Sequence, residues 1–284
     1  MGRYDRLRYI RTLDPVKDCA EIFSLVTRYE FPWDYHLAFK IAGMTDMTMP
    51  SISGLLVHTG QFATAGDKRV DDSVLFEYEA KRAGLDSAQG HRAVRALNKV
   101  HGRYDISNDD YLFVLASWTT GPIRWINQYG WRKLTDIEVQ AMVETDRRLG
   151  QLMGVKGVPE TYQDFLALLD DGLTHRAQYA QANRAMADTL IGIVQSWFPR
   201  FTRPLLRTAI IALVEPPVRR LVGLNDPPEW FTIWVRRALR ARGRLVRLLP
   251  ARPHARPYRH RPRSYPLGWT IEDLGPQHLP EGAE

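Results

Sequence analysis

The chain has 284 residues, a net charge of +7 and an ordinary globular composition, with 44% hydrophobic and 25% charged residues. This length suffices for one large domain or two small ones, and this composition excludes wholesale disorder. Cys19 is the only cysteine, which excludes an intrachain disulfide, a cysteine-rich zinc site and a cysteine-ligated iron–sulfur cluster. Residues 1–18 are charged throughout and lack the apolar stretch of a signal peptide, so we expect a cytoplasmic protein.

Apolar residues at helical spacing predict several helices in the first part of the chain. They cover residues 19–30, 33–42, 51–62, 67–83 and 88–104. Gly60 and Gly66 bracket a predicted loop, and Gly84 is expected to end the fourth of these helices. Ser87 has the position and side chain of a cap for the fifth.

The second part of the chain is also predicted to be helical. Asn108 or Asp109 can cap a helix to residue 129 that is apolar nearly all round, which indicates burial on most sides. Thr135 and Glu138 have the spacing of a capping box, and the helix that they start is expected to end at Gly154. Helices are then predicted at 159–170 and 175–197, before short helices between prolines and an extended segment from residue 250. No pair of strands joined by a hairpin turn is indicated, so the predicted fold class is all-α.

His101 is the first candidate for chemistry. At 100° per residue it lies on the same side of its helix as Val94, Leu97 and Tyr104, while the basic residues of the segment point elsewhere. An inward-facing neutral imidazole can bind a metal ion, or it can be a hydrogen-bonded residue of the core. The spacing alone favours the core residue.

Arg69, Asp72 and Ser73 form the second candidate group. Arg69 and Ser73 are four residues apart and share a helix face, and Asp72 could line the same site. An arginine directed inward can hold a carboxylate by a charge-assisted fork. The alternative is a solvated helix start with acids in its first turn, which is common and stabilising.

Other residues with reactive or aromatic side chains have simpler structural explanations. Four aromatic residues are typical of core packing: Trp118, Trp125, Tyr129 and Trp131. Three acids are typical of helix caps, and their alternative is a hard-metal site shared with His101: Asp105, Asp109 and Asp110. No phosphate loop, nucleophile elbow or dinucleotide fingerprint is present, which argues against the common hydrolases and nicotinamide enzymes.

Residues 236–263 hold eleven arginines and no acid, so the rest of the chain is mildly acidic. From 231 to 249 these arginines alternate with apolar residues, a pattern that lies on anionic membranes. The alternative, which we favour at this stage, is a helix packed on the core with its arginine face in water. Nucleic-acid binding is disfavoured because no aromatic stacking platform accompanies the arginines.

Several motifs together resemble the catalytic domain that bacterial rubber oxygenases (latex-clearing proteins) share with the fungal MpaB-type oxygenase of mycophenolic acid biosynthesis. The matching stretches are Thr59-Gly60, Arg69-x-x-Asp72-Ser73, Leu97-Asn98-x-Val100-His101-x-x-Tyr104, Ile106-Ser107-Asn108-Asp109-Asp110, Pro122-Ile123-Arg124-Trp125, Tyr129-Gly130-Trp131-Arg132-x-Leu134-Thr135 and, more weakly, Tyr265-Pro266-Leu267-Gly268-Trp269. The resemblance is nearer to the MpaB-type branch.

The resemblance implies a helical fold with a globin-like core and an enzyme that cleaves an isoprenoid carbon–carbon double bond with dioxygen. It implies haem b as the cofactor, held through one axial histidine that His101 matches. Arg69 matches the family's arginine, and Ser73 replaces its threonine four residues later. Arg69, Asp72 and Ser73 are therefore the expected catalytic residues, with His101, Arg69 and Ser73 binding the cofactor.

Two departures from the family pattern change these expectations. The lysine that caps the distal iron face in rubber oxygenases falls at Asp72 here, so a closed state of that kind is not expected. The family's catalytic glutamate has no clear match, and Glu77 and Glu79 are candidates by proximity alone.

These observations predict a helical oxygenase-like domain over 1–230, followed by a basic amphipathic segment and a Pro/Arg-rich tail over 231–284. The favoured function is a haem-dependent oxygenase acting on a lipophilic substrate, in a cytoplasmic protein that can associate with an anionic membrane through residues 236–263. The alternatives are a relative with a non-haem metal or no metal, and a non-enzymatic peripheral membrane protein.

Overall fold

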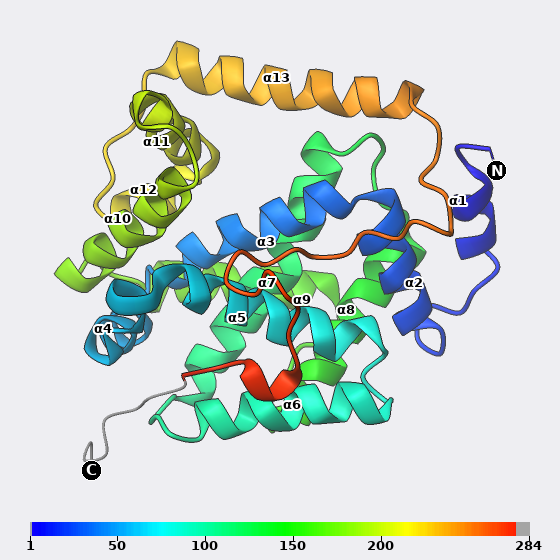
Figure 1. Ribbon diagram of the computed structural model, residues 1–284, viewed down its shortest axis with the longest axis horizontal. Helices are drawn as coiled ribbons and strands as arrows, with labels where there is room; N and C mark the ends of the chain where they lie inside the picture. The colour runs from blue at the N-terminus through cyan, green and yellow to red at the C-terminus, as the bar shows by residue number, and fades with distance from the viewer. Residues whose placement is uncertain (1, 277–284) are drawn as a thin grey trace.

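The computed structural model describes residues 2–276, and every regular element within that range is helical (Figure 1). The α-helices are α1 (Asp5–Ile10), α2 (Cys19–Leu25), α3 (Pro32–Asp46), α4 (Pro50–Thr59), α5 (Gln61–Arg82), α6 (Ala88–His101), α7 (Asn108–Tyr129), α8 (Asp136–Leu152), α9 (Tyr162–Asp171), α10 (Gln181–Ser196), α11 (Arg203–Leu213), α12 (Pro216–Leu221) and α13 (Glu229–Leu248). Single turns of π- or 3₁₀-helix are η1 (Val26–Glu30), η2 (Gly172–Arg176), η3 (Arg200–Thr202) and η4 (Ile271–Asp273). The all-α prediction is confirmed.

Local capping signals set several helix boundaries where they were predicted. The Ser87 hydroxyl accepts the backbone N–H of Gly90 at 2.9 Å and caps α6. Thr135 and Glu138 form a reciprocal capping box at the start of α8. The cap of α7 is Ser107, one residue before the two predicted candidates, because its hydroxyl accepts the N–H of Asp110.

The predicted loop between Gly60 and Gly66 is wrong. Only Gly60 adopts the left-handed conformation, and α5 begins directly after it with a kink at Ala65. Gly66 lies inside the helix, where a Cβ would come within 2.7 Å of the Ile193 side chain on α10. This glycine therefore serves close packing of two helices, which a sequence pattern does not distinguish from a turn.

The helix predicted over 175–197 is present as α10, but its predicted start is wrong. A π-turn, η2, closes α9, and an extended stretch follows it before α10 begins at Gln181.

The core is centred on α7, which packs against α3, α8, α9 and α13. Phe113, Ala116, Ile123 and Ile126 on α7 are essentially inaccessible to solvent. Together with residues of α2, α3, α8 and α9 they form the largest apolar cluster. Burial on most sides of this helix is thus confirmed.

The chain from residue 250 is extended apart from η4, and it returns across the helices of the first half (Figure 1, orange to red). We call residues 250–276 the C-terminal strap. It pairs with the backbone at Arg28, places Tyr258 against the ring of His36 on α3, and buries Leu274 against Leu75 and Phe76 on α5. The strap therefore covers α5 and reaches α6.

Helix α13 lies along one edge of the molecule and packs on α11 and α7 (Figure 1). A Cβ at Gly243 would meet the carbonyl oxygen of Tyr129 at 2.5 Å, so the backbones of α13 and α7 touch here. The division of the chain at residue 230 stays a prediction. No helix within residues 2–276 is long and apolar enough to span a membrane.

Candidate active site

Arg69 and Ser73 lie together on one face of α5, as their spacing predicts. The Arg69 guanidinium donates to the Ser73 hydroxyl, which in turn donates to the Arg69 carbonyl oxygen at 3.0 Å. The guanidinium carbon lies 5.2 Å from the centre of the Phe62 ring. Within residues 2–276 no carboxylate forms an ion pair with Arg69. Its removal from solvent lowers the pKa of the guanidinium. This half-buried cation therefore has no counterion among the described residues and can bind an anion.

His101 is the last residue of α6, and its ring packs against that of Tyr111 on α7 at a centroid distance of 5.5 Å. Its Nδ1 atom is buried and has no hydrogen-bond partner in the part of the chain that the structure describes. Burial, together with the charge of Arg69, lowers the pKa of His101 to about 4. The imidazole is thus neutral at pH 7, which is the form that binds a metal ion.

Asp72 does not share the face of Arg69 and Ser73. Its carboxylate accepts hydrogen bonds from Lys68 at 2.7 Å, from the hydroxyl of Tyr265 at 2.5 Å and from the backbone N–H of Gly275 at 3.2 Å. Residues 68 and 72 are four apart and share a neighbouring face, one that the C-terminal strap covers. Asp72 therefore joins α5 to the strap, and its catalytic role stays a prediction.

The two candidate glutamates lie further along α5. Glu77 is eight residues, or about 12 Å, beyond Arg69. It accepts from Lys81 at 2.7 Å and from the hydroxyl of Tyr35 at 2.5 Å. Glu79 pairs with Arg82 at 3.0 Å and accepts from Gln89. Neither glutamate is recorded in contact with Arg69 or His101.

Lys81 is the centre of a buried ion cluster made of Tyr35, Glu77, Lys81 and Asp146. The lysine bridges Glu77 and Asp146, and all three charged side chains are almost inaccessible. Burial opposes its charge, but Asp146 and Glu77 outweigh this and raise the pKa of Lys81. Burial raises the pKa of Asp146, a change that Lys81 opposes.

Two further histidines were not singled out by the sequence. His36 on α3 and His260 on the strap are buried, with ring centroids 5.7 Å apart. Nε2 of His36 and both ring nitrogens of His260 have no hydrogen-bond partner among residues 2–276. Burial lowers the pKa of both histidines to about 4. Only the strap brings them together, so no local sequence signal could have paired them.

Trp125, Tyr129 and Trp131 are buried, as core packing predicts, but none of the three acids caps α7, whose cap is Ser107. Trp125 packs against Tyr129 at 4.7 Å and near Trp33. Asp110 is buried and accepts from Ser51 and Arg176. In the range that the structure describes, no group of three or more His, Cys, Asp or Glu side chains is placed to hold a metal ion.

Comparison with solved structures shows the fold in another protein. The chain superposes on the latex clearing protein LCP in its closed state with a TM-score of 0.59 and 16% sequence identity. The match covers 84% of this chain and 69% of that one. At this identity the likeness establishes the fold and no more.

Curated relatives are fungal enzymes. The ER-bound oxygenase mpaB' of Penicillium brevicompactum is 24% identical over 249 residues, which are 81% of this chain and 59% of the relative. The ER-bound oxygenase mpaB of Penicillium roqueforti (strain FM164) is 27% identical over 145 residues, 49% of each chain. This chain thus spans about three fifths of the first of these relatives and about half of the second.

The model of one protein family matches residues 48–249, which include α5, α6 and α7 with Arg69, Ser73 and His101. That match spans well over half of the chain. The family is described as the catalytic domain of the ER-bound oxygenases mpaB and mpaB' and of rubber oxygenase. The chain belongs to this oxygenase family.

Proposed function

We propose that this protein is an oxygenase that holds haem b through His101 and uses dioxygen on a lipophilic, isoprenoid-like substrate. One observation carries the proposal: a neutral imidazole with an unbonded, buried nitrogen lies within electrostatic reach of a half-buried arginine that has no carboxylate partner within residues 2–276. Buried polar groups without partners are rare, and they gather where a ligand completes the bonding.

The residues present fit a haem. His101 would hold the haem iron, because its imidazole is neutral at pH 7 and its Nδ1 atom has no hydrogen-bond partner among residues 2–276. Arg69, oriented by its bond to Ser73, would hold a propionate. Bound haem supplies the dioxygen chemistry, and the protein supplies orientation and exclusion of water.

The surroundings of Arg69 and His101 support an apolar substrate. The Phe62 ring lies against Arg69, the Tyr111 ring lies against His101, and Leu97 and Val100 pack near the strap from the same helix as His101. Three methionines expected to suit a deformable substrate, Met44, Met47 and Met49, are buried in the clusters between α4, α7, α10 and α11. The family's inclusion of rubber oxygenase supports a substrate with isoprenoid double bonds. Cleavage of such a bond places one oxygen atom of dioxygen on each carbonyl product.

The absorption spectrum tests the cofactor. Protein purified after expression with ample haem, or reconstituted with haemin, is expected to show a Soret band that His101→Ala abolishes. His91→Ala, ten residues earlier on the same helix, is the matched control and should keep the band. A colourless protein whose circular dichroism shows intact helices, or a Soret band that survives in His101→Ala, would overturn the proposal.

Activity is tested on the haem-loaded protein. Incubation with oligomeric isoprene should consume dioxygen and release products with terminal carbonyl groups, detected by hydrazone formation and mass spectrometry. Saturated oligomers of equal length are the control substrate and should give neither.

A further inference from the structure

Part of the outward face of α13 is an exposed apolar stripe, which is unusual for a surface helix. Trp230 and Trp234 are 70% and 61% exposed, and Leu248 is 81% exposed. With Leu245 they lie within about 60° of one another around the helix, at 100° per residue. Because tryptophan is normally at least partly buried, two exposed tryptophans on one stripe mark a surface that contacts something.

The inward face of α13 is already used by the protein. Phe231 and Val235 are buried with Ala212 of α11, and Gly243 touches the backbone of α7. The helix is therefore fixed in orientation, and its exposed stripe is not an unpacked core face. A second contact surface remains on the side away from the molecule.

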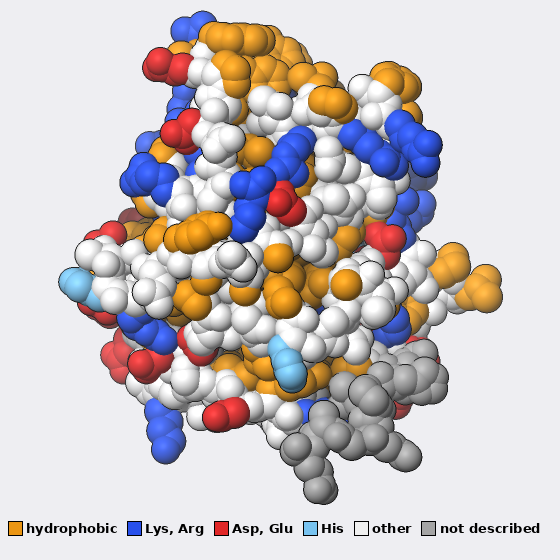
Figure 2. All heavy atoms as spheres, turned by 90° about the vertical axis from the view of Figure 1, so that its left-hand side faces the viewer, with side chains coloured by type: hydrophobic (Ala, Val, Ile, Leu, Met, Phe, Trp, Pro, Cys, Tyr) orange, Lys and Arg blue, Asp and Glu red, His pale blue; other side chains and the backbone are white. Residues whose placement is uncertain are grey.

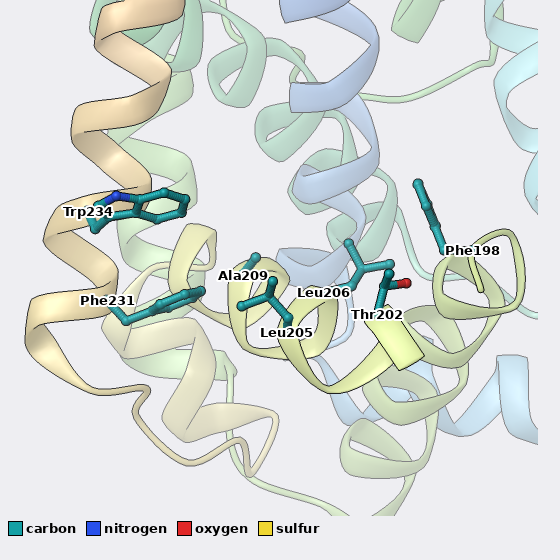
Figure 3. Close-up of a pocket in the computed structure, with 7 residues that line it drawn as sticks. All are labelled: Phe198, Thr202, Leu205, Leu206, Ala209, Phe231 and Trp234. Carbon is teal, nitrogen blue, oxygen red and sulfur yellow. The ribbon is translucent and has the colours of Figure 1, made fainter. Parts of the chain in front are cut away.

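A groove of about 240 Å³ continues this surface towards η3 and α11. Figure 3 shows Phe231 and Trp234 of α13 on one side of it, with Leu205, Leu206 and Ala209 of α11 opposite. Phe198 and Thr202 complete the lining. Beside the groove, Phe201 projects from η3 and is 86% exposed. The groove is thus apolar on all sides and open to solvent.

Arginines without acidic partners flank the apolar stripe. Arg242 pairs with Asp34 on α3, but no ion pair within residues 2–276 involves the other five arginines of α13: Arg236, Arg237, Arg240, Arg244 and Arg247. No acid follows Glu229 in this helix. At 100° per residue these five lie on one side of the stripe. Figure 2 shows apolar side chains gathered at the edge where α13 lies, with Lys and Arg side chains on the same face.

We propose that α13, η3 and the start of α11 form a docking surface for an anionic lipid bilayer. Trp230 and Trp234 would lie at the level of the headgroups, the groove would accept part of an acyl chain, and the unpaired arginines would bind lipid phosphates. Charge complementarity identifies the occupant, because an apolar stripe beside five unpaired arginines matches an apolar layer beneath negative headgroups. A docked enzyme would draw a lipophilic substrate from the membrane.

The structure narrows the membrane segment expected from the sequence. Within the basic stretch 236–263, the exposed apolar stripe lies on α13, whereas residues 250–263 belong to the strap. The backbone N–H of Tyr258 donates to the carbonyl oxygen of Arg28, and that of Ser264 donates to the Asp71 carboxylate, which holds the strap on the protein. The surface proposed here does not depend on haem or on catalysis.

Flotation of the full chain with vesicles tests the surface. We expect the protein to float with phosphatidylcholine vesicles that contain phosphatidylglycerol, and to float weakly or not at all with phosphatidylcholine alone. The double variants Trp230→Ser/Trp234→Ser and Arg237→Gln/Arg244→Gln should each weaken binding by about tenfold or more. High salt should weaken the wild type and the tryptophan variant, and affect the arginine variant least.

Matched control variants distinguish binding through this surface from nonspecific binding to vesicles. Leu267→Ser removes a fully exposed leucine of the strap, and Arg103→Gln removes an exposed arginine beyond α6; both should bind vesicles like the wild type. Circular dichroism should be the same for all variants, because each altered side chain is exposed. Failure of the wild type to bind anionic vesicles, or unchanged binding by both double variants, would overturn the proposal. So would a dimer in sedimentation that Trp230→Ser/Trp234→Ser dissociates, because a second copy would then cover the face.

Discussion

Helix α5 carries two polar groups of opposite character, about three turns apart. Near its start, Arg69 has no acidic partner within the described chain, and the neighbouring His101 has an unbonded nitrogen. Near its end, Glu77 and Lys81 are bonded to each other and to groups on α3 and α8. Both groups are largely removed from solvent, but only the second is satisfied by the protein itself.

This difference in bonding distinguishes the structural cluster at Lys81 from the candidate binding site at Arg69 and His101. A buried charge is tolerated when partners surround it, and the cluster at Lys81 then fixes how α3, α5 and α8 pack. A half-buried cation without a counterion and an imidazole with an unbonded nitrogen destabilise the protein unless a ligand binds them. The family match covers Arg69 and His101 as well as Glu77, Lys81 and Asp146, so membership alone does not tell the two groups apart.

Removal of Lys81 should have the largest effect on stability. Lys81→Met leaves Glu77 and Asp146 buried without a cation, and we expect the free energy of unfolding to fall by about 3–5 kcal/mol. Urea denaturation followed by circular dichroism measures this loss. Lys99→Met, on the exposed side of α6, is the control and should change stability by less than about 0.5 kcal/mol. A loss of the same small size in Lys81→Met would contradict the structural role of the cluster.

The pH dependence of stability tests the burial of His260, whose ring lies near those of His36 and Tyr78. Its pKa is about 4 in the folded chain, against 6.5 when exposed, so the unfolded state binds more protons between these values. Stability therefore falls as the pH falls from 6.5 to 4. Relative to His260→Phe, which has no proton to bind, the wild type should lose up to about 3 kcal/mol over this range.

The comparison with a variant is needed because Asp46 changes the stability with pH in the opposite direction. Burial raises its pKa to about 7, so it stabilises the fold as the pH falls. This contribution is common to both chains and cancels in their difference. His58→Phe removes an exposed histidine and should show the pH profile of the wild type. A constant difference between the wild type and His260→Phe from pH 7 to pH 4.5 would contradict the assigned burial.

Arg69→Gln should have the smallest effect on stability and a distinct effect on haem. No acid is left unpaired by the change, so the free energy of unfolding should move by less than about 1 kcal/mol. Loss of a charge-assisted bond to a propionate should weaken haem binding by about tenfold, measured by titration of the Soret band. Arg95→Gln, an exposed change on α6, is the control. A loss of stability as large as that of Lys81→Met would contradict the distinction between a structural cluster at Lys81 and a binding site at Arg69.

Sequence patterns predicted the features that depend on neighbours along the chain. The capping box at Thr135, the stop at Gly84 and the all-round burial of α7 follow from residues within one helix. The pairing of Arg69 with Ser73 follows in the same way, since four residues make one turn.

Features that depend on distant segments were not predictable. The sequence predicted a loop that ends at Gly66. The close packing of Gly66 against Ile193 could not be predicted, because Ile193 is 127 positions away. The sequence predicted that Asp72 could line the site of Arg69. Its actual partners could not be predicted, because Tyr265 and Gly275 come from the strap. The apolar stripe of α13 was difficult to recognise in the sequence for a related reason. Arginines and leucines alternate along the chain, and they fall on different sides only when the residues are placed around the helix.

The strap has a consequence for how the protein is made. Asp72 and Tyr265 bond to each other across 193 positions of sequence, and Leu274 covers Leu75 and Phe76. During synthesis α5 therefore leaves the ribosome long before the residues that cover it, and its apolar side chains stay uncovered until residues 265–274 have been made. Closure over so long a separation is slow, so the nascent chain should depend on chaperones until the strap has been synthesised.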